Sequence, residues 1–110
     1  MKIAIESNDG KTIKFPFEVT KGYIICDVAE DNTFKTSYRK ISKKSSSKET
    51  NPLRQCSTII TRGMDKKDIE ELKNNGIDIF VTFKTSAESA LSSYMKERLI
   101  NLPLLNENFH

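Results

Sequence analysis

The chain has 110 residues, of which 36% are hydrophobic and 30% are charged, and its formal net charge is +3. This length suits one small domain with a single modest core. No run of about 18 apolar residues is present, so the sequence predicts no membrane-spanning helix. Glu6 interrupts the apolar start that a signal peptide needs, and we therefore expect a cytoplasmic protein.

The positive charge is concentrated in one segment. Residues 35–48 hold six basic residues and no acidic one, whereas the rest of the chain holds 12 basic and 15 acidic residues. Nucleic-acid binding through this segment is an open alternative. Only Tyr38 offers an aromatic ring that could stack on a base, so the composition favours a solvated loop instead.

The first half of the chain predicts an antiparallel meander. Residues 2–6 alternate as a strand, residues 8–10 (Asn-Asp-Gly) mark a turn, and residues 12–15 resume the alternation. Residues 23–28 form a strong β-branched strand, and residues 33–41 form an outer one. The short turns between these strands imply antiparallel pairing.

The second half predicts buried parallel strands. Residues 42–55 carry almost no apolar side chain, and we expect a mobile basic loop within a domain that spans residues 1–98. Residues 56–61 and 77–81 are short runs with no polar face, as is typical of parallel strands covered on both sides. The predicted fold is therefore α/β, a mixed five-stranded sheet with an antiparallel meander followed by β-α-β-α.

Two helices are expected to cover this sheet. The first begins at Asp65, the predicted N-cap, ends before Gly76, and has Ile69 and Leu72 as its buried stripe. The second begins with a capping box at residues 85–88. Its apolar side chains then follow helical spacing: Ala87, Ala90, Leu91, Tyr94 and Met95.

Residues 99–110 form an unusually apolar tail, in which Pro103 prevents a simple continuation of the helix. Leaving its leucines and Phe109 in water would cost about 1.5 kcal/mol or more for each side chain. The tail therefore either packs back over the sheet of a monomer or makes a homodimer contact.

Five segments resemble a known family in their amino-acid sequence, order and spacing: residues 2–11, 20–28, 58–64, 72–82 and 86–91. Over residues 1 to about 95 the chain resembles the dinitrogenase iron-molybdenum cofactor biosynthesis family, the NifX-like carrier domains. The resemblance implies a ribonuclease H-like fold. It also implies a protein that is not a catalyst but binds iron–sulfur or iron–molybdenum cofactor precursors and carries them between metallocluster assembly proteins.

Two segments depart from that family's pattern. Many members have a His-Phe-Gly segment after the second strand and a loop rich in His and Gly before the central strand. Here residues 16–18 read Pro-Phe-Glu, with Phe17 at the matched position, and residues 43–48 contain only Lys and Ser. Both departures remove iron ligands. A lysine-rich loop can still attract an anionic cluster, although it cannot ligate one well.

The segment Arg62-Gly63-Met64-Asp65 joins a parallel strand to a helix, where open α/β sheets usually bind ligands. Backbone N–H groups at a helix N-terminus and the Arg62 guanidinium favour an anion. The loop that contains Asp9 ends the first strand at the same edge. A tight turn with a helix cap explains the same residues without any ligand.

Cys26 and Cys56 are the only strong cluster ligands in the chain. They could meet at one end of the sheet and, across a dimer, supply four thiolates to a cluster. The alternative is two buried core thiols. His110 is the only histidine, so a four-ligand zinc site and Ser/His or Cys/His catalysis both lack residues, and we expect no enzyme.

The sequence therefore leaves three functions open. The first is a small carrier or accessory domain that binds an anionic metallocluster. The second is a protein-interaction module that has kept the fold and lost cofactor binding. The third is nucleic-acid binding through the basic loop.

Overall fold

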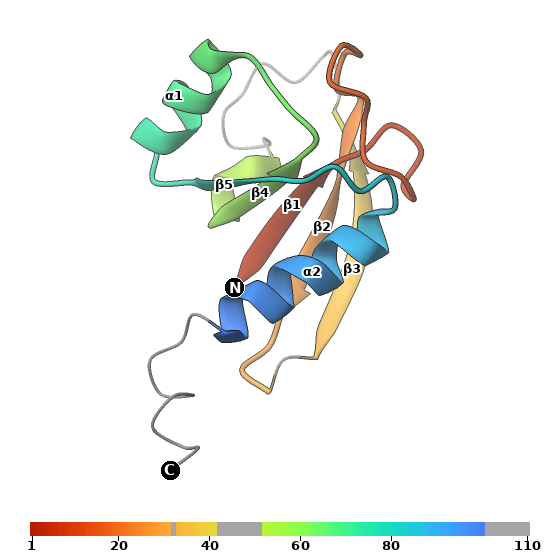
Figure 1. The fold of residues 1–110 in the computed structure, drawn as a ribbon, viewed down its shortest axis with the longest axis vertical. Coiled ribbons are helices and arrows are strands. Elements are labelled where there is room, and N and C mark those ends of the chain that lie inside the picture. Colours follow the sequence, from red (N-terminus) through yellow and green to blue (C-terminus); the bar gives the residue numbers. More distant parts are fainter. Residues whose placement is uncertain (32, 42–51, 101–110) are drawn as a thin grey trace.

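The computed structural model describes residues 1–31, 33–41 and 52–100 (Figure 1). Within these ranges the chain forms a mixed sheet of five strands, two α-helices and a short 3₁₀ helix. In chain order the elements are β1 (Lys2–Glu6), β2 (Gly22–Val28), β3 (Phe34–Lys40), η2 (Pro52–Gln55, the 3₁₀ helix), β4 (Thr58–Thr61), α1 (Lys66–Asn74), β5 (Asp78–Val81) and α2 (Ala87–Ile100).

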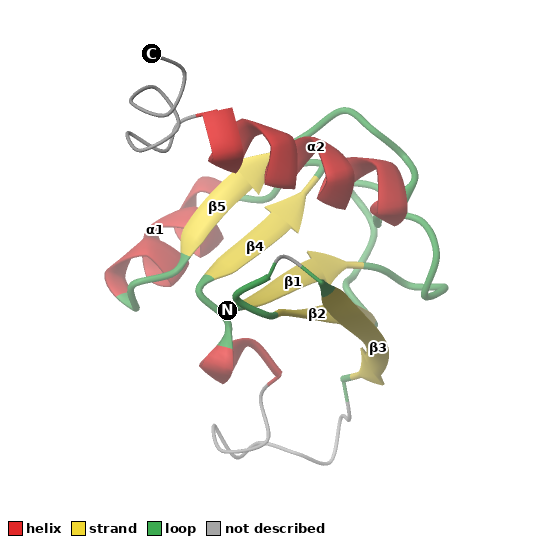
Figure 2. Ribbon diagram, turned by 90° about the horizontal axis from the view of Figure 1, so that it is seen from below, coloured by secondary structure: helices red, strands yellow, loops and turns green. Residues whose placement is uncertain are grey.

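The strand order of the sheet is β3-β2-β1-β4-β5 (Figure 2). β1 pairs antiparallel with β2 and parallel with β4, so that Ile3 lies opposite Cys26 on one side and Thr58 on the other. β2 and β3 pair antiparallel, and β4 and β5 pair parallel. The predicted mixed sheet, a meander followed by parallel strands, is confirmed.

Residues 12–15 do not form the strand that their alternation predicts. Thr12 makes one isolated bridge to Ser86, and the next two backbone N–H groups have different partners. The N–H of Ile13 donates to Thr85 O at 2.8 Å, and that of Lys14 donates to Glu6 O at 2.8 Å. This segment therefore ties the β1–β2 loop to the start of α2 instead of extending a strand.

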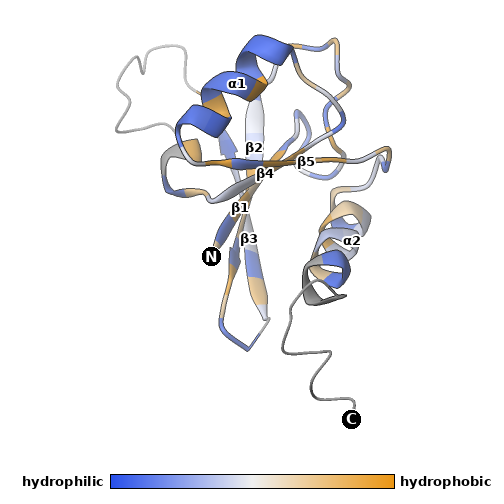
Figure 3. Ribbon diagram, turned by 60° about the vertical axis from the view of Figure 1, so that its left-hand side comes forward, coloured by the Kyte–Doolittle hydropathy of each residue, from blue (hydrophilic) through white to orange (hydrophobic). Residues whose placement is uncertain are grey.

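The two helices lie on opposite faces of the sheet, as the nearly edge-on view of Figure 3 shows. Alternation along β1 divides the core, since Ile3 and Ile5 face α2 while Ala4 faces α1. The α2 face buries eleven residues: Ile3, Ile5, Ile13, Ile24, Cys26, Val28, Ile60, Ala87, Ala90, Leu91 and Met95. The α1 face buries seven: Ala4, Tyr23, Ile25, Leu53, Cys56, Ile59 and Ile77.

Helix α1 is packed loosely against the sheet. None of its residues is buried, and the predicted stripe of Ile69 and Leu72 is only half-buried. Leu72 packs against the α1-face core, and η2 covers part of that face with the buried side chain of Leu53. The prediction that β5 is a buried strand is wrong, because β5 forms the edge of the sheet and its residues are half-buried or exposed.

The helix ends agree with the sequence to within one residue. Asp65 is the N-cap residue of α1 as predicted, but its side chain makes no capping hydrogen bond. Gly76, with φ of +80°, follows the helix end, where glycine is the residue that best tolerates such a backbone. At α2 the cap is Ser86, whose Oγ accepts from the N–H of Ser89 at 3.3 Å, so the predicted box at residues 85–88 is misplaced by one position.

Some expectations fall on segments that the structure does not describe. Residues 42–51 of the basic loop and residues 101–110 of the apolar tail are among these. The loop prediction for residues 42–55 is wrong at its end, because Pro52–Gln55 is a 3₁₀ helix whose Leu53 reaches the apolar face of the sheet. In the described part of the chain, no helix combines the length and apolarity needed to cross a bilayer.

Candidate functional site

The carboxyl ends of β1 and β4 lead into two loops that meet where these strands end. We call this end of the sheet the carboxyl edge. The guanidinium carbon of Arg62 lies 4.6 Å from the centroid of the Phe15 ring, within the range of a cation–π contact. Gly63 has φ of +152°, and a Cβ there would lie 3.5 Å from Pro16. A Cβ at that distance would make only an ordinary contact, so the positive φ, which other residues rarely adopt, is what favours glycine in the β4–α1 loop.

A buried lysine stiffens the β1–β2 loop. Lys14 is only 6% exposed, and its Nζ donates to the carbonyl oxygens of Phe15 and Glu18, both at 2.9 Å. Charge-assisted hydrogen bonds of this kind are stronger than neutral ones. This role could not be predicted from the sequence, because Lys14 occupies a position that alternation in a strand would leave exposed.

The stiffened loop presents apolar side chains to solvent. Phe17, a predicted binding residue, is 95% exposed, and Phe83, which follows β5, is 93% exposed. The edge patch, as we define it, comprises Phe15, Phe17, Val19 and Phe83. The hydrogen bond from Ile13 N to Thr85 O brings the two loops that carry these residues together.

Asp9 has a local role. Its carboxylate accepts hydrogen bonds from the backbone N–H groups of Thr12 (2.7 Å) and Lys11 (2.8 Å) and from the Thr12 hydroxyl (2.7 Å). The bond from the Thr12 N–H is the main reason that the pKa of Asp9 lies well below its usual range. Asp9 therefore closes a turn, and its hydrogen bonds do not join it to Arg62 or Asp65.

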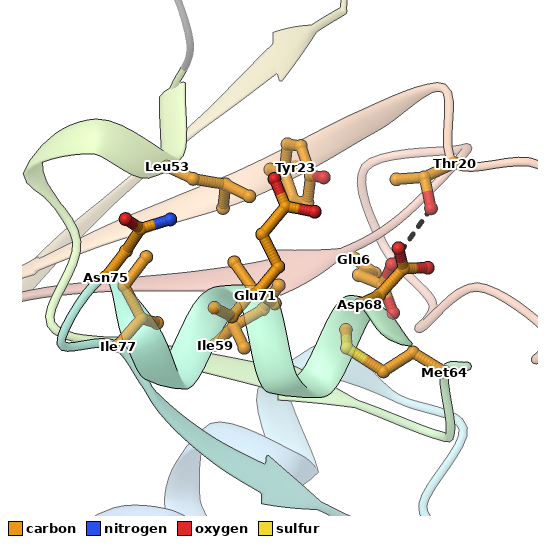
Figure 4. Close-up of a pocket in the computed structure, with 11 residues that line it drawn as sticks. Glu6, Thr20, Tyr23, Leu53, Ile59, Met64, Asp68, Glu71, Asn75 and Ile77 are labelled. Atoms are coloured by element: carbon orange, nitrogen blue, oxygen red, sulfur yellow. Dashed lines mark hydrogen bonds between the residues drawn. The ribbon is translucent and has the colours of Figure 1, made fainter. Parts of the chain in front are cut away.

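A cavity of about 690 Å³ lies under α1 (Figure 4). Of the predicted binding loop, only Met64 lines it; Asp65 is exposed. The remaining lining residues come from β1, β2, η2, β4, α1 and the loops beside them: Glu6, Thr20, Tyr23, Leu53, Ile59, Asp68, Glu71, Leu72, Asn75 and Ile77. Three of these described residues are acidic and none is basic, so the part of the lining that the structure describes is electronegative.

Glu6 provides the buried charge of this cavity. Only 5% of the residue is exposed, and its Oε2 accepts from the Thr20 hydroxyl at 2.9 Å while its Oε1 accepts from the Thr61 hydroxyl. Burial, followed by the charges of Glu6 and Asp68, raises the pKa of Tyr23 to about 12. This role could not be predicted from the sequence, since Glu6 ends a strand, where an exposed acidic residue is ordinary.

Comparison with known proteins decides the family. Residues 1–97 match the family model described as dinitrogenase iron-molybdenum cofactor. The chain belongs to this family. The resemblance seen in the sequence is thereby confirmed. No protein with a curated description matches the chain significantly.

Solved structures share the fold. A crystal structure of a protein proposed to be a dinitrogenase, from Methanocaldococcus jannaschii, is similar with a TM-score of 0.69 and 22% identity, over 88% of this chain and 89% of that one. An NMR structure of a protein proposed to be a NifB protein, from Thermotoga, gives a TM-score of 0.60 and 14% identity, over 88% and 89% of the two chains. At these identities the likeness concerns the fold alone.

The cysteines of this dinitrogenase iron-molybdenum cofactor family member do not share a site. Both lie toward the same end of the sheet, but Cys26 is buried on the α2 face and Cys56 on the α1 face. Burial raises the pKa of Cys26 to about 11 and raises the pKa of Cys56 as well. Among the residues that the structure describes, no group of three or more His, Cys, Asp or Glu is arranged to hold a metal ion.

Proposed function

We propose that this chain is a non-enzymatic accessory protein of iron–molybdenum cofactor biosynthesis that docks on a cluster-bearing assembly protein through its carboxyl edge. The observation that carries the proposal is the edge patch itself, in which two almost fully exposed phenylalanines lie on the hydrogen-bonded loops at the end of the sheet that also carries the Arg62–Phe15 pair. Exposed apolar groups around an arginine are typical of protein interaction sites. With this role we propose the ribonuclease H-like fold, which the order β3-β2-β1-β4-β5 supports.

Chemistry favours docking over ligation. The thiols of Cys26 and Cys56 are separated by the sheet and favour their protonated form, whereas cluster ligation uses thiolates. The carboxylates in the cavity under α1 would repel an anionic cluster. In this proposal the metal ligands stay on the assembly protein, and the accessory chain covers its surface.

A carrier that itself holds an anionic metallocluster is the second candidate, and the Arg62 guanidinium is the observation that favours it. The N–H groups of Met64 and Asp65 would add donors near the N-terminus of α1, whereas that of Gly63 already donates to Thr61 Oγ1. Phe17 would provide apolar cover. Asp9 would contribute only by shaping its loop. Homodimer formation through residues 99–110 stays a prediction, because most of that tail lies outside the described residues.

The experiment compares two surface variants under anaerobic conditions. Phe17→Ser with Phe83→Ser removes the most exposed part of the edge patch. Phe34→Ser is the matched control, because Phe34 is also an exposed aromatic but lies opposite Val28, at the other end of the sheet. Each protein is titrated into a scaffold protein that carries a reconstituted [4Fe–4S] cluster, and the iron content of the isolated chain is measured separately.

The proposal predicts an iron-free chain that binds the loaded scaffold, with affinity lowered tenfold or more in the double variant and unchanged in the control. An isolated chain that takes up iron and sulfide with a cluster absorption band would establish the carrier instead. An affinity for the loaded scaffold that is the same in the double variant as in the wild type, or no binding at all, would overturn docking through the edge patch.

A further inference from the structure

The cavity under α1 combines a buried charge with an apolar wall. We infer that it binds an organic cation, namely a primary ammonium or guanidinium group on an apolar stem. This inference does not depend on the proposed function, because the residues that carry it are not those of the edge patch. It concerns a ligand of opposite charge to the family's cluster cargo.

Glu6 sets the charge of the ligand. A carboxylate has about four acceptor sites, and the hydroxyls of Thr20 and Thr61 occupy two of them. Both donors are neutral, and among the described residues that line the cavity none is basic. A buried charge is costly without an opposite charge, so a cation with N–H donors would satisfy the remaining acceptor capacity of Glu6.

Two further carboxylates extend this preference toward solvent. Asp68 and Glu71 are exposed residues of α1, and both line the cavity (Figure 4). They project from the helix α1, whereas Glu6 projects from the strand β1 of the sheet. A cation that enters between helix and sheet would therefore approach three negative charges, whereas an anion would be repelled by the same three carboxylates.

The remaining lining residues suit an apolar stem. Ile59, Ile77 and Leu53 are buried side chains that line the cavity, and Leu72 and Met64 add half-buried ones. The volume of about 690 Å³ is within the usual range for small-ligand sites, about 300 to 1,000 Å³. Since no residue of α1 is buried, the helix can adjust to a stem without breaking a packed core.

The test uses matched ligands of similar length. The ¹⁵N-labelled full chain is titrated with n-butylammonium and n-butylguanidinium, with 1-pentanol as the neutral control and valerate as the anionic one. We expect saturable shifts of the amides of Glu6, Tyr23 and Glu71 with the two cations, binding at least tenfold weaker for pentanol, and none for valerate. Equal binding of pentanol and the cations, or no saturable shift, would overturn the inference.

Variants tie the binding to the cavity. Asp68→Asn with Glu71→Gln should weaken cation binding at least fivefold, and both positions are exposed, so the fold should survive. Glu70→Gln is the matched control, because Glu70 is an exposed acid of the same helix that does not line the cavity. An unchanged affinity in the double variant, or an equal loss in the control, would contradict the assignment.

A second arm identifies the source of the cation. A blocked Ala-Lys-Leu peptide is compared with n-butylammonium, and a blocked Ala-norleucine-Leu peptide serves as its neutral control. Tenfold tighter binding of the lysine peptide would point to a basic side chain of a partner protein. Equal or weaker binding would point to a free amine or guanidine.

Discussion

The carboxylate of Glu6 accepts a hydrogen bond from the hydroxyl of Thr61, and this contact joins the carboxyl ends of β1 and β4. Thr61 is itself fully buried, and its Oγ1 also accepts from the N–H of Gly63 at 3.1 Å. One hydroxyl therefore links the buried charge of the cavity to the loop that carries Arg62. The cavity under α1 and the loop of the carboxyl edge are therefore both held in place by the Thr61 hydroxyl.

Thr61→Val should destabilise the protein by about 2 to 3 kcal/mol. Valine has nearly the same shape, but it removes the hydroxyl that donates to Oε1 of the buried Glu6 carboxylate and accepts from the Gly63 N–H, and only the Thr20 hydroxyl would still donate to Glu6. Thr58→Val is the control. Its hydroxyl is also buried but bonds only to the neutral Tyr94 hydroxyl, at 3.2 Å, so we expect a loss of about 1 kcal/mol. Urea unfolding measures both, and equal losses would contradict a special role for Thr61.

Lys14→Met should loosen the β1–β2 loop, since the buried ammonium bonds to backbone carbonyls of that loop. We expect a loss of about 1.5 to 3 kcal/mol in urea unfolding, the usual range for hydrogen bonds that involve a charged group. Amide hydrogen exchange of residues 15–19 should accelerate at the same time. Lys11→Met, at an exposed position of the same loop, should change neither quantity. Unaltered exchange in Lys14→Met would show that another contact holds the loop.

The sheet could be predicted from the sequence because the hydrophobic patterns of its strands are local and periodic. Alternation in β1 and β2 and the uninterrupted run in β4 report directly which faces are buried. The same logic failed at residues 12–15 and at β5. An alternating segment without a neighbouring strand cannot form a ladder, and a short apolar run does not reveal whether it lies at the centre or the edge of a sheet.

The sites were harder to predict because they depend on contacts between distant residues. The Arg62–Phe15 contact links two loops that are 47 positions apart in sequence, and the Glu6–Thr61 bond spans 55. Cys26 and Cys56 illustrate the same limit. The end of the sheet that they occupy follows from strand direction, but their opposite faces follow from register, which the sequence alone left open.

Tyr23 predicts a loss of stability at alkaline pH. Its pKa is raised from 10.0 to about 12 in the folded protein, mainly by burial. Between these two pH values the unfolded chain releases a proton that the folded chain retains, so stability is intact below pH 10 and falls as pH rises toward 12. The change should approach about 2 to 3 kcal/mol. Tyr23→Phe should flatten this part of the pH profile in urea unfolding, and a profile as steep as that of the wild type would contradict the assignment.

The buried cysteines predict slow thiol chemistry. Burial raises the pKa values of both Cys26 and Cys56, so at pH 7.5 neither should be a reactive thiolate. We expect Ellman's reagent to label neither thiol over minutes in the native protein, and to label both at once in 6 M guanidinium chloride. Cys26→Ala and Cys56→Ala, each labelled alone, assign any reaction to one position. Rapid labelling of either thiol in the native state would show an accessible thiolate, and it would return cysteine ligation of a cluster to consideration.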